Sequence, residues 1–199
     1  MGGNDLNPSL LPRYYSVRVS CLRVNIKTGD LAQRADMNSG RYAFGTCQMG
    51  QFIYVVGGRL DDYNLIASCE RYDIFANKWT QLSQLTDTYT SQVTVESIKK
   101  RLIYGFGGRN ADLERPQGER ILRLDTLKLW KGWATLNLIS PTNGYSYGVF
   151  PLKTDGDYAE FLVFGGCDSV RNMNRSCVFS TNLFDFRKSN FTLLTGPLS

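Results

Sequence analysis

The stretch FIYVVGGRL (residues 52–60) runs from five apolar or aromatic residues into two glycines and an arginine. Similar stretches recur as LIYGFGGRN (residues 102–110) and FLVFGGCDS (residues 161–169). The doubled glycines are Gly57-Gly58, Gly107-Gly108 and Gly165-Gly166, so they lie 50 and 58 residues apart. A self-similar pattern with a period near 50 residues predicts an array of structural repeats.

A second set of landmarks follows the first two glycine pairs. In SCERYDIFANKW (residues 68–79), Tyr72 and Asp73 precede Trp79. In ILRLDTLKLWKGW (residues 121–133), Asp125 precedes Trp133. The landmarks therefore keep step with the glycines over two complete repeats.

Two further stretches carry weaker versions of these landmarks. After the third glycine pair, SCVFSTNLFDFRKSNF (residues 176–191) aligns with Asn182 in place of the aspartate and Phe191 in place of the tryptophan. Before the first pair, SCLRVNIKTGDL (residues 20–31) mirrors residues 68–79, with Asn25 for the aspartate and Leu31 for the tryptophan. The chain thus contains three full repeats and one half repeat.

Each full repeat is expected to form four short strands. In the first repeat they span about residues 42–48, 51–56, 66–72 and 78–82, which are rich in Val, Ile, Tyr, Phe and Trp. A tight hairpin at Met49-Gly50 joins the first two strands, and the corresponding turns are Lys99-Lys100 and Asp155-Gly156. Because no window shows sustained 3.6-residue periodicity, helices are expected to be nearly absent.

The doubled glycines have a physical reason in such an array. A four-stranded sheet cannot bury both of its faces alone, whereas sheets stacked radially cover one another. Inner strands crowd near the common axis, where glycine lets backbones approach closely and lets the chain leave a strand at positive φ. The third-strand Tyr or Asp and the fourth-strand Trp then hold the sheet edge against its neighbour.

The pattern resembles the Kelch repeat of β-propellers over about residues 16–195. The resemblance implies an all-β fold, a partial Kelch-type β-propeller of about three and a half four-stranded blades. An N-terminal extension (1–15) precedes a propeller segment (16–199) made of a half blade (16–38) and blades at about 41–86, 89–139 and 144–195. The structural residues of the repeat are Gly57, Gly58, Tyr72, Asp73, Trp79, Gly107, Gly108, Asp125, Trp133, Gly165 and Gly166.

The ring is not closed by these blades alone, since closed propellers hold four to eight blades. We expect the remaining blades to come from further chain or from a second subunit. A stable isolated arc is disfavoured because its end blades would expose apolar faces and strand edges.

Composition excludes several classes of function. The formal net charge is +5, from 23 Lys and Arg against 18 Asp and Glu, without a long basic run, so no nucleic-acid partner is expected. No run of 18 apolar residues is present, so no membrane partner is expected. The chain has no histidine, the commonest general base and transition-metal ligand, and neither a metal nor another cofactor is expected.

The five cysteines show no CxxC spacing and are interpreted as buried, reduced thiols. Reduced thiols indicate a cytoplasmic protein. The cysteines are Cys21, Cys47, Cys69, Cys167 and Cys177.

Candidate partner-binding residues fall at one end of the propeller. Strands alternate in direction, so the link from second to third strand and the link between blades lie at the same end. The candidates there are Arg41, Arg59, Asp61, Asp62, Tyr63, Arg109, Asn110, Asp168 and Arg171. The resemblance implies that arginines at positions such as 41, 59 and 109 hold acidic, extended peptides, since guanidinium gives bidentate hydrogen bonds to carboxylate. The alternative is that these residues are solvated loop charges.

The expected function is a non-catalytic protein–protein interaction or scaffold module, in the cytoplasm or on the cytoskeleton. One alternative is the substrate-recognition propeller of a ubiquitin-ligase adaptor. Another is a Kelch-like propeller enzyme, which the absence of histidine disfavours. Fold alone does not decide between these functions.

Overall fold

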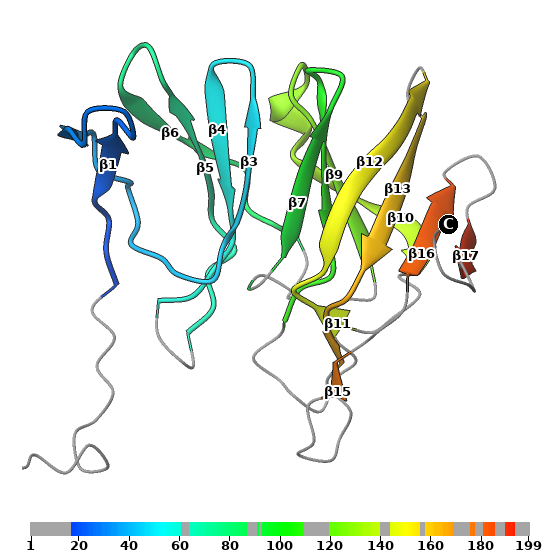
Figure 1. Cartoon of the computed structure of the whole chain (residues 1–199). Helices are drawn as coiled ribbons and strands as arrows, with labels where there is room; N and C mark the ends of the chain where they lie inside the picture. The colour runs from blue at the N-terminus through cyan, green and yellow to red at the C-terminus, as the bar shows by residue number, and fades with distance from the viewer. Residues whose placement is uncertain are drawn as a thin grey trace, which may run out of the picture.

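A computed structural model of the chain describes residues 17–60, 64–86, 91, 93–109, 120–139, 144–155, 158–168, 176–177, 181–185 and 190–193. These residues form a row of antiparallel sheets stacked side by side (Figure 1). Within the described ranges the only helical segment is the three-residue 3-10 turn η1 (Leu129–Lys131), which confirms the expectation of a nearly helix-free chain.

Three four-stranded sheets follow one another along the chain, each with its strands in sequence order. Blade 1 contains β3 (Gly45–Met49), β4 (Phe52–Val56), β5 (Cys69–Asp73) and β6 (Lys78–Leu82). Blade 2 contains β7 (Thr94–Ile98), β8 (Leu102–Phe106), β9 (Arg120–Asp125) and β10 (Trp133–Ile139). Blade 3 contains β12 (Gly148–Asp155), β13 (Tyr158–Phe164), β16 (Thr181–Asp185) and β17 (Asn190–Leu193).

Two smaller sheets complete the described part of the chain. The predicted half blade is the pair β1 (Cys21–Val24) and β2 (Leu31–Arg34). A three-stranded sheet of β11 (Gly144–Tyr145), β14 (Cys167–Asp168) and β15 (Ser176–Cys177) was not predicted. It lies beyond the end of blade 3 that is opposite the β12–β13 hairpin (Figure 1).

Strand boundaries in blade 1 differ from the prediction by a few residues. Met49 pairs with Phe52, so the hairpin turn is Gly50-Gln51, one residue later than expected. The first and third strands also begin three residues later than predicted. The backbone before them forms isolated bridges instead, at Tyr42–Arg59 and Arg59–Leu65.

Strand register confirms the alignment of the half blade with blade 1. Val24 lies opposite Leu31 as Tyr72 lies opposite Trp79, so Leu31 occupies the tryptophan place.

One side-chain turn recurs after the third strand of three units. Asn25, Asp73 and Asp125 each accept a hydrogen bond from the backbone N–H two residues further on, at 3.0, 2.9 and 3.0 Å. Asn and Asp favour this geometry because their short side chains reach the following backbone. The aspartate of the repeat is therefore a turn residue, which explains its fixed place between the third and fourth strands.

In blade 3 the predicted alignment of the aspartate was wrong. Asp185 pairs with Asn190, as Asp73 pairs with Lys78, so Asp185 and not Asn182 holds the aspartate place. The alignment of Phe191 was correct, because it lies opposite Phe184 at the tryptophan place.

All three doubled glycines adopt positive φ at both positions. The φ angles are 61° and 118° at Gly57-Gly58, 64° and 124° at Gly107-Gly108, and 67° and 96° at Gly165-Gly166. Side chains rarely adopt these angles, so the chain leaves each second strand by a route that favours glycine. A Cβ at Gly58 would also lie only 2.9 Å from the carbonyl oxygen of Tyr42.

Two apolar cores lie between the blades. The first joins blades 1 and 2 through buried residues such as Tyr54, Ile103 and Leu124, and the second joins blades 2 and 3 through Tyr104 and Phe161. Radial stacking therefore covers both faces of blade 2, as the repeat pattern predicted.

Trp79 fastens blade 1 to the half blade. Its indole Nε1 donates a 2.8 Å hydrogen bond to the carbonyl oxygen of Ala35, and its ring centroid lies 5.0 Å from that of Tyr72. The side chain is half-buried. This arrangement confirms that the fourth-strand tryptophan holds the sheet edge against its neighbour.

We expect Trp79→Ala to lower the free energy of unfolding by about 2–4 kcal/mol, because it removes a large half-buried ring and one hydrogen bond. Trp130→Ala is the matched control, since Trp130 is 76% exposed and the same atoms are lost. Urea denaturation of both variants measures the difference. Equal losses in the two variants would contradict the fastening role of Trp79.

Candidate protein-interaction surface

The residue after each doubled glycine pairs with the backbone of the link that enters the same blade. Tyr42 and Arg59 exchange hydrogen bonds of 3.0 and 2.9 Å, and Ser91 and Arg109 exchange hydrogen bonds of 3.4 and 2.7 Å. In blade 3 the pairing of β11 with β14 has the same form. These pairs bring the links between second and third strands and the links between blades to the same end of the blades. We call it the Gly-Gly end.

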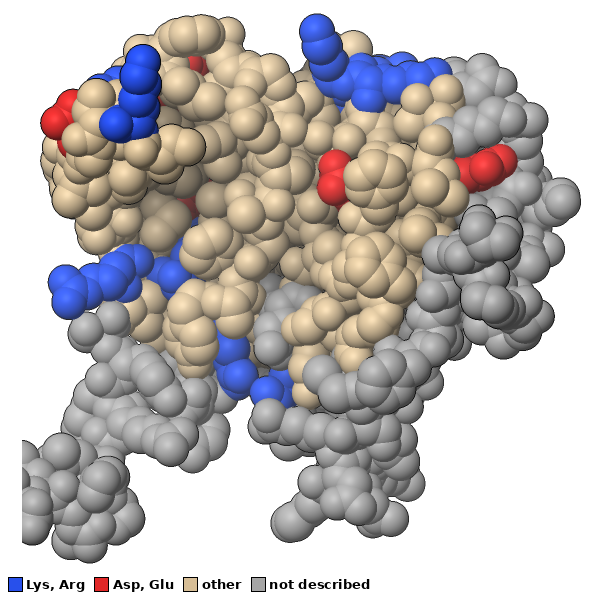
Figure 2. All heavy atoms as spheres, in the orientation of Figure 1, with Lys and Arg blue, Asp and Glu red and all other residues tan. Residues whose placement is uncertain are grey.

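Arg59 and Arg109 occupy equivalent places in neighbouring blades, and both are half-buried. The guanidinium carbon of Arg109 lies 5.8 Å from the centroid of the Tyr145 ring, within the range of a cation–π contact. Basic side chains are visible at both ends of the stacked blades in Figure 2, with a largely uncharged surface between them. The structure thus presents two arginines in register at the Gly-Gly end.

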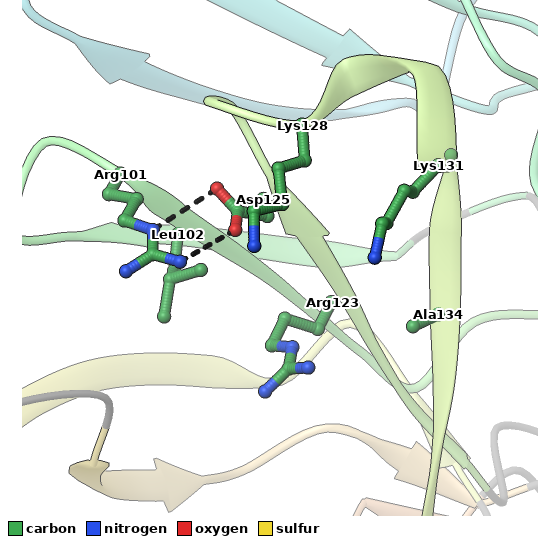
Figure 3. A pocket seen from close by; sticks show the side chains of 8 residues that line it. Arg101, Leu102, Arg123, Asp125, Lys128, Lys131 and Ala134 are labelled. Atoms are coloured by element: carbon green, nitrogen blue, oxygen red, sulfur yellow. Dashed lines mark hydrogen bonds and ion pairs between the residues drawn. The ribbon is translucent and has the colours of Figure 1, made fainter.

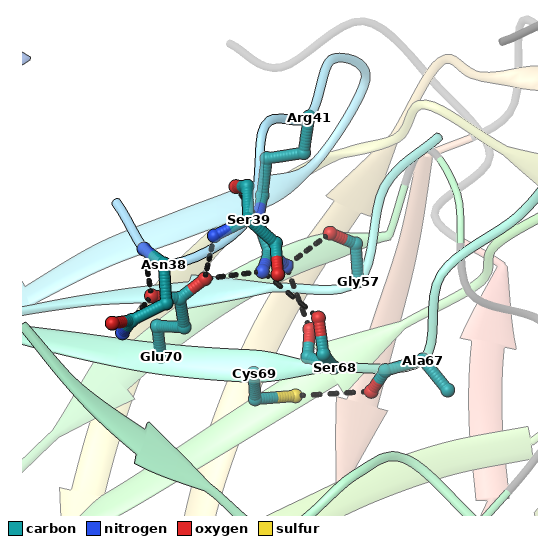
Figure 4. A network of polar contacts seen from close by, with 8 residues as sticks. All are labelled: Asn38, Ser39, Arg41, Gly57, Ala67, Ser68, Cys69 and Glu70. Atoms are coloured by element: carbon teal, nitrogen blue, oxygen red, sulfur yellow. Dashed lines mark hydrogen bonds and ion pairs between the residues drawn. The ribbon is translucent and has the colours of Figure 1, made fainter. Parts of the chain in front are cut away.

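Arg41 has a different environment from the one expected. Its side chain is fully buried and forms a 2.6 Å ion pair with Glu70, whose side chain is also fully buried (Figure 4). It also donates to the carbonyl oxygens of Gly57 and Ser68, at 2.8 and 2.7 Å, and to the Ser68 hydroxyl at 2.9 Å. Arg41 is therefore corrected from an exposed peptide contact to a structural residue that holds the Gly-Gly turn.

The Glu70 carboxylate connects the half blade to blade 1. Besides Arg41, it accepts hydrogen bonds from the backbone N–H of Asn38 at 2.9 Å, from the Asn38 side-chain amide at 2.6 Å and from the N–H of Ser39 at 3.2 Å. Both residues belong to the link between β2 and β3. A buried carboxylate is tolerated here because a cation and three further donors surround it.

This network is not a general feature of the repeat. Glu70 lies opposite Val55, and the corresponding place in blade 2, opposite Gly105, is held by Leu122. Sequence reasoning missed Glu70, because the strand CERYD also contains Arg71 and Asp73 and nothing in the sequence marks Glu70 as its buried charge.

Breaking the buried pair is expected to be strongly destabilising. Glu70→Leu leaves the Arg41 guanidinium buried without its carboxylate, which costs about 3–5 kcal/mol of unfolding free energy. The double variant Arg41→Met/Glu70→Leu should recover most of that loss, because an apolar pair replaces an ion pair. Chemical denaturation of the two variants checks this expectation, and a double variant as unstable as the single one would contradict it.

Of the other predicted partner-binding residues, the structure describes only Asp168. Asp168 lies in β14 at the Gly-Gly end. Asp61, Asp62, Tyr63, Asn110 and Arg171 lie outside the described residues.

Burial makes two of the described cysteine thiols difficult to ionise. Burial raises the pKa of the Cys47 thiol to about 12 and that of Cys69 to about 11, so both thiols are protonated and unreactive at neutral pH. Cys21, Cys47 and Cys69 are free thiols. In the described ranges no three His, Cys, Asp or Glu side chains gather where they could hold a metal ion, and no helix is long and apolar enough to cross a membrane.

Comparisons with known proteins agree with this architecture. A sequence model of the Kelch motif matches residues 40–86. The chain is 33% identical over 166 residues to Beta-scruin of Limulus polyphemus, and 35% identical over 98 residues to Kelch-like protein 13 of Mus musculus. The chain belongs to the Kelch-repeat family. The Beta-scruin match covers 80% of this chain and 17% of the relative, and the Kelch-like protein 13 match covers 47% and 14%.

A solved structure, that of YjhT, shows the same fold. The match covers 94% of this Kelch-repeat chain and 67% of the YjhT chain, with a TM-score of 0.66 and 12% sequence identity. The fold is a Kelch-type β-propeller segment whose ring the described blades do not close.

Proposed function

We propose that this Kelch-repeat chain is a non-catalytic protein-interaction module whose Gly-Gly end holds an acidic, extended segment of a partner protein. The observation that carries the proposal is the equivalent placement of Arg59 and Arg109. Each follows a doubled glycine, and its backbone is held to the link that enters its blade by two hydrogen bonds of 2.7–3.4 Å. Successive arginines on successive blades suit successive carboxylates of an extended chain.

The chemistry of this end favours carboxylate ligands. Guanidinium groups bind carboxylates through two parallel hydrogen bonds. The backbones of Arg59 and Arg109 are held by hydrogen bonds, which reduces the entropy lost when a ligand binds. Arg41 contributes indirectly in this proposal, because it fixes the carbonyl of Gly57, two residues before Arg59. The formal net charge of +5 favours an acidic partner as well.

The two alternative functions make different demands. Substrate recognition for a ubiquitin ligase uses the same end of the propeller, and co-purification of ligase subunits would distinguish it from a scaffold role. An enzyme would need an activated side chain. The absence of histidine and the raised pKa of Cys47 and Cys69 favour a non-catalytic role.

Replacing Arg59 or Arg109 with alanine should weaken binding of a Glu/Asp-rich extended peptide about tenfold to a hundredfold, because one charge-assisted hydrogen bond contributes roughly 1.5–3 kcal/mol. The probe is a set of peptides in extended form, each compared with its Gln/Asn counterpart by fluorescence anisotropy at two salt concentrations. Arg23→Ala is the matched control, since Arg23 is exposed on β1, away from this end.

Equal affinity for the acidic and amide peptides would overturn the proposal. So would an Arg23→Ala variant that loses as much affinity as Arg59→Ala. Binding through the Gly-Gly end also requires that raised salt weaken the interaction, since the arginines are partly exposed.

We also propose that further propeller strands, from additional chain or a second subunit, cover the half blade. Among the described residues β1 pairs only with β2, whereas the equivalent strand β5 pairs on both edges. The half blade also exposes apolar side chains: Val19, Leu22, Val24, Ile26 and Leu31. Exposed apolar residues beside an open strand edge favour pairing with another strand.

Under this proposal the 199-residue chain alone should self-associate in sedimentation velocity experiments, and Leu31→Glu should reduce the association at least several-fold. Leu31 is 67% exposed, and Phe75→Glu is the control because Phe75 is 81% exposed on the β5–β6 turn. A chain that stays monomeric at all concentrations would argue against a second copy and for strands of additional chain.

A further inference from the structure

A cavity of about 300 Å³ lies at the opposite end of blade 2 from its doubled glycine. It opens between the hairpin turn before β8, the end of β9 and the η1 segment before β10 (Figure 3). Its lining residues are Arg101, Leu102, Arg123, Asp125, Lys128, Lys131, Gly132 and Ala134. We call it the basic cavity, because four of these side chains are cationic.

Only one of the four cations is neutralised within the cavity. Arg101 binds both oxygens of Asp125, at 3.2 and 2.8 Å, and this contact holds the pKa of the Asp125 carboxyl below its usual 3.8. No hydrogen bond or ion pair within the described part of the chain uses the charged groups of Arg123, Lys128 or Lys131. Four cations and one carboxylate give the cavity a net charge of +3.

The four cationic side chains line one cavity. Figure 3 shows Lys128 beside Asp125 and Lys131 directed toward the same space, with Arg101 on the other side of Asp125 and the Arg123 guanidinium further from the carboxylate. Lys128 and Lys131 are exposed and Arg123 is half-buried, so the site is open to a ligand from solution.

Blade 1 shows that the repeat does not require these charges. Gln51 stands where blade 2 has Arg101, and it binds Asp73 at 2.9 Å as Arg101 binds Asp125. The four-residue turn after Asp73, residues 74–77, contains no cation, whereas the longer segment of blade 2 carries Lys128 and Lys131. The larger number of cationic side chains at this end therefore distinguishes blade 2 from blade 1.

Arg71 of blade 1 occupies the place of Arg123 but has a different partner. Its guanidinium carbon lies 4.5 Å from the centroid of the Phe52 ring. The equivalent of Phe52 in blade 2 is Leu102, which offers no aromatic face. Arg123 is thus available for a ligand in a way that Arg71 is not.

We propose that the basic cavity binds the dianionic group of a phosphate monoester. A net charge of +3, with Asp125 already counted, attracts a dianion more strongly than the single charge of a carboxylate. The combination of a planar guanidinium with two lysine point charges suits a tetrahedral oxyanion approached from several sides. The volume is at the lower end for small-molecule sites, so it fits a compact group.

The test measures binding of three probes at constant ionic strength by isothermal titration calorimetry: inorganic phosphate, a capped phosphoserine tripeptide and a capped glutamate tripeptide. Phosphate and phosphoserine should bind the wild-type chain, and glutamate at least tenfold more weakly. Arg123→Met should weaken phosphate binding about tenfold and Arg123→Met/Lys131→Met about a hundredfold. Arg71→Met is the matched control and should leave phosphate binding unchanged.

The two phosphate probes distinguish the sources of the group. Tighter binding of the phosphoserine tripeptide indicates a phosphorylated protein segment, and equal or tighter binding of inorganic phosphate indicates a small phosphorylated molecule. The proposal is overturned if the glutamate tripeptide binds as tightly as phosphate, or if Arg71→Met lowers affinity as much as Arg123→Met. Circular dichroism of each variant confirms that the blades remain folded.

Discussion

Close packing of neighbouring inner strands is the constraint on which the rest of this structure depends. β7 lies between β3 and β12 and contacts both. At Gly45 the approach is so close that a Cβ would lie 2.5 Å from the carbonyl oxygen of Val93 and would overlap the Val95 side chain. Once the inner strands are this close, the outer strands spread apart, and the space between them must be filled by larger side chains such as Trp133.

Much of this architecture could be predicted from the sequence, because the repeat marks its turns with residues of restricted geometry. The doubled glycines, Asp73 and the half-blade residues Asn25 and Leu31 were all placed correctly. In blade 3 the serine-cysteine pair at residues 176–177 forms the separate strand β15, so it lies further from the aspartate than in blade 1, and Asp185 was missed. A small extra sheet in a loop has no periodic signal, so pattern matching could not detect the displacement.

Sequence reasoning was less successful with the charged residues, since a charge has no periodicity of its own. Arg41, Arg59 and Arg109 looked alike as arginines near a blade entrance. Arg41 is buried against Glu70, a partner 29 residues away, and only three-dimensional proximity reveals that pairing. Likewise, nothing in the sequence marks Arg101, in its hairpin turn, as part of a site, yet the longer β9–β10 connection contributes two lysines to the same cavity.

The serial arrangement of the blades has a consequence for cooperativity. In the described part of the chain, the strongest contacts between blades join neighbours, through links such as the 2.7 Å hydrogen bond from the Thr94 hydroxyl to the Tyr147 carbonyl and the 2.8 Å bond from the Ser97 hydroxyl to the Gln48 carbonyl. In such nearest-neighbour arrays the terminal units open first, because they have one interface where internal units have two. Blade 2 should therefore have the slowest-exchanging amides of the chain, and the half blade should exchange on the timescale of local fraying. A propeller segment of this kind can adapt its outer units to a partner while its central blade keeps a fixed conformation.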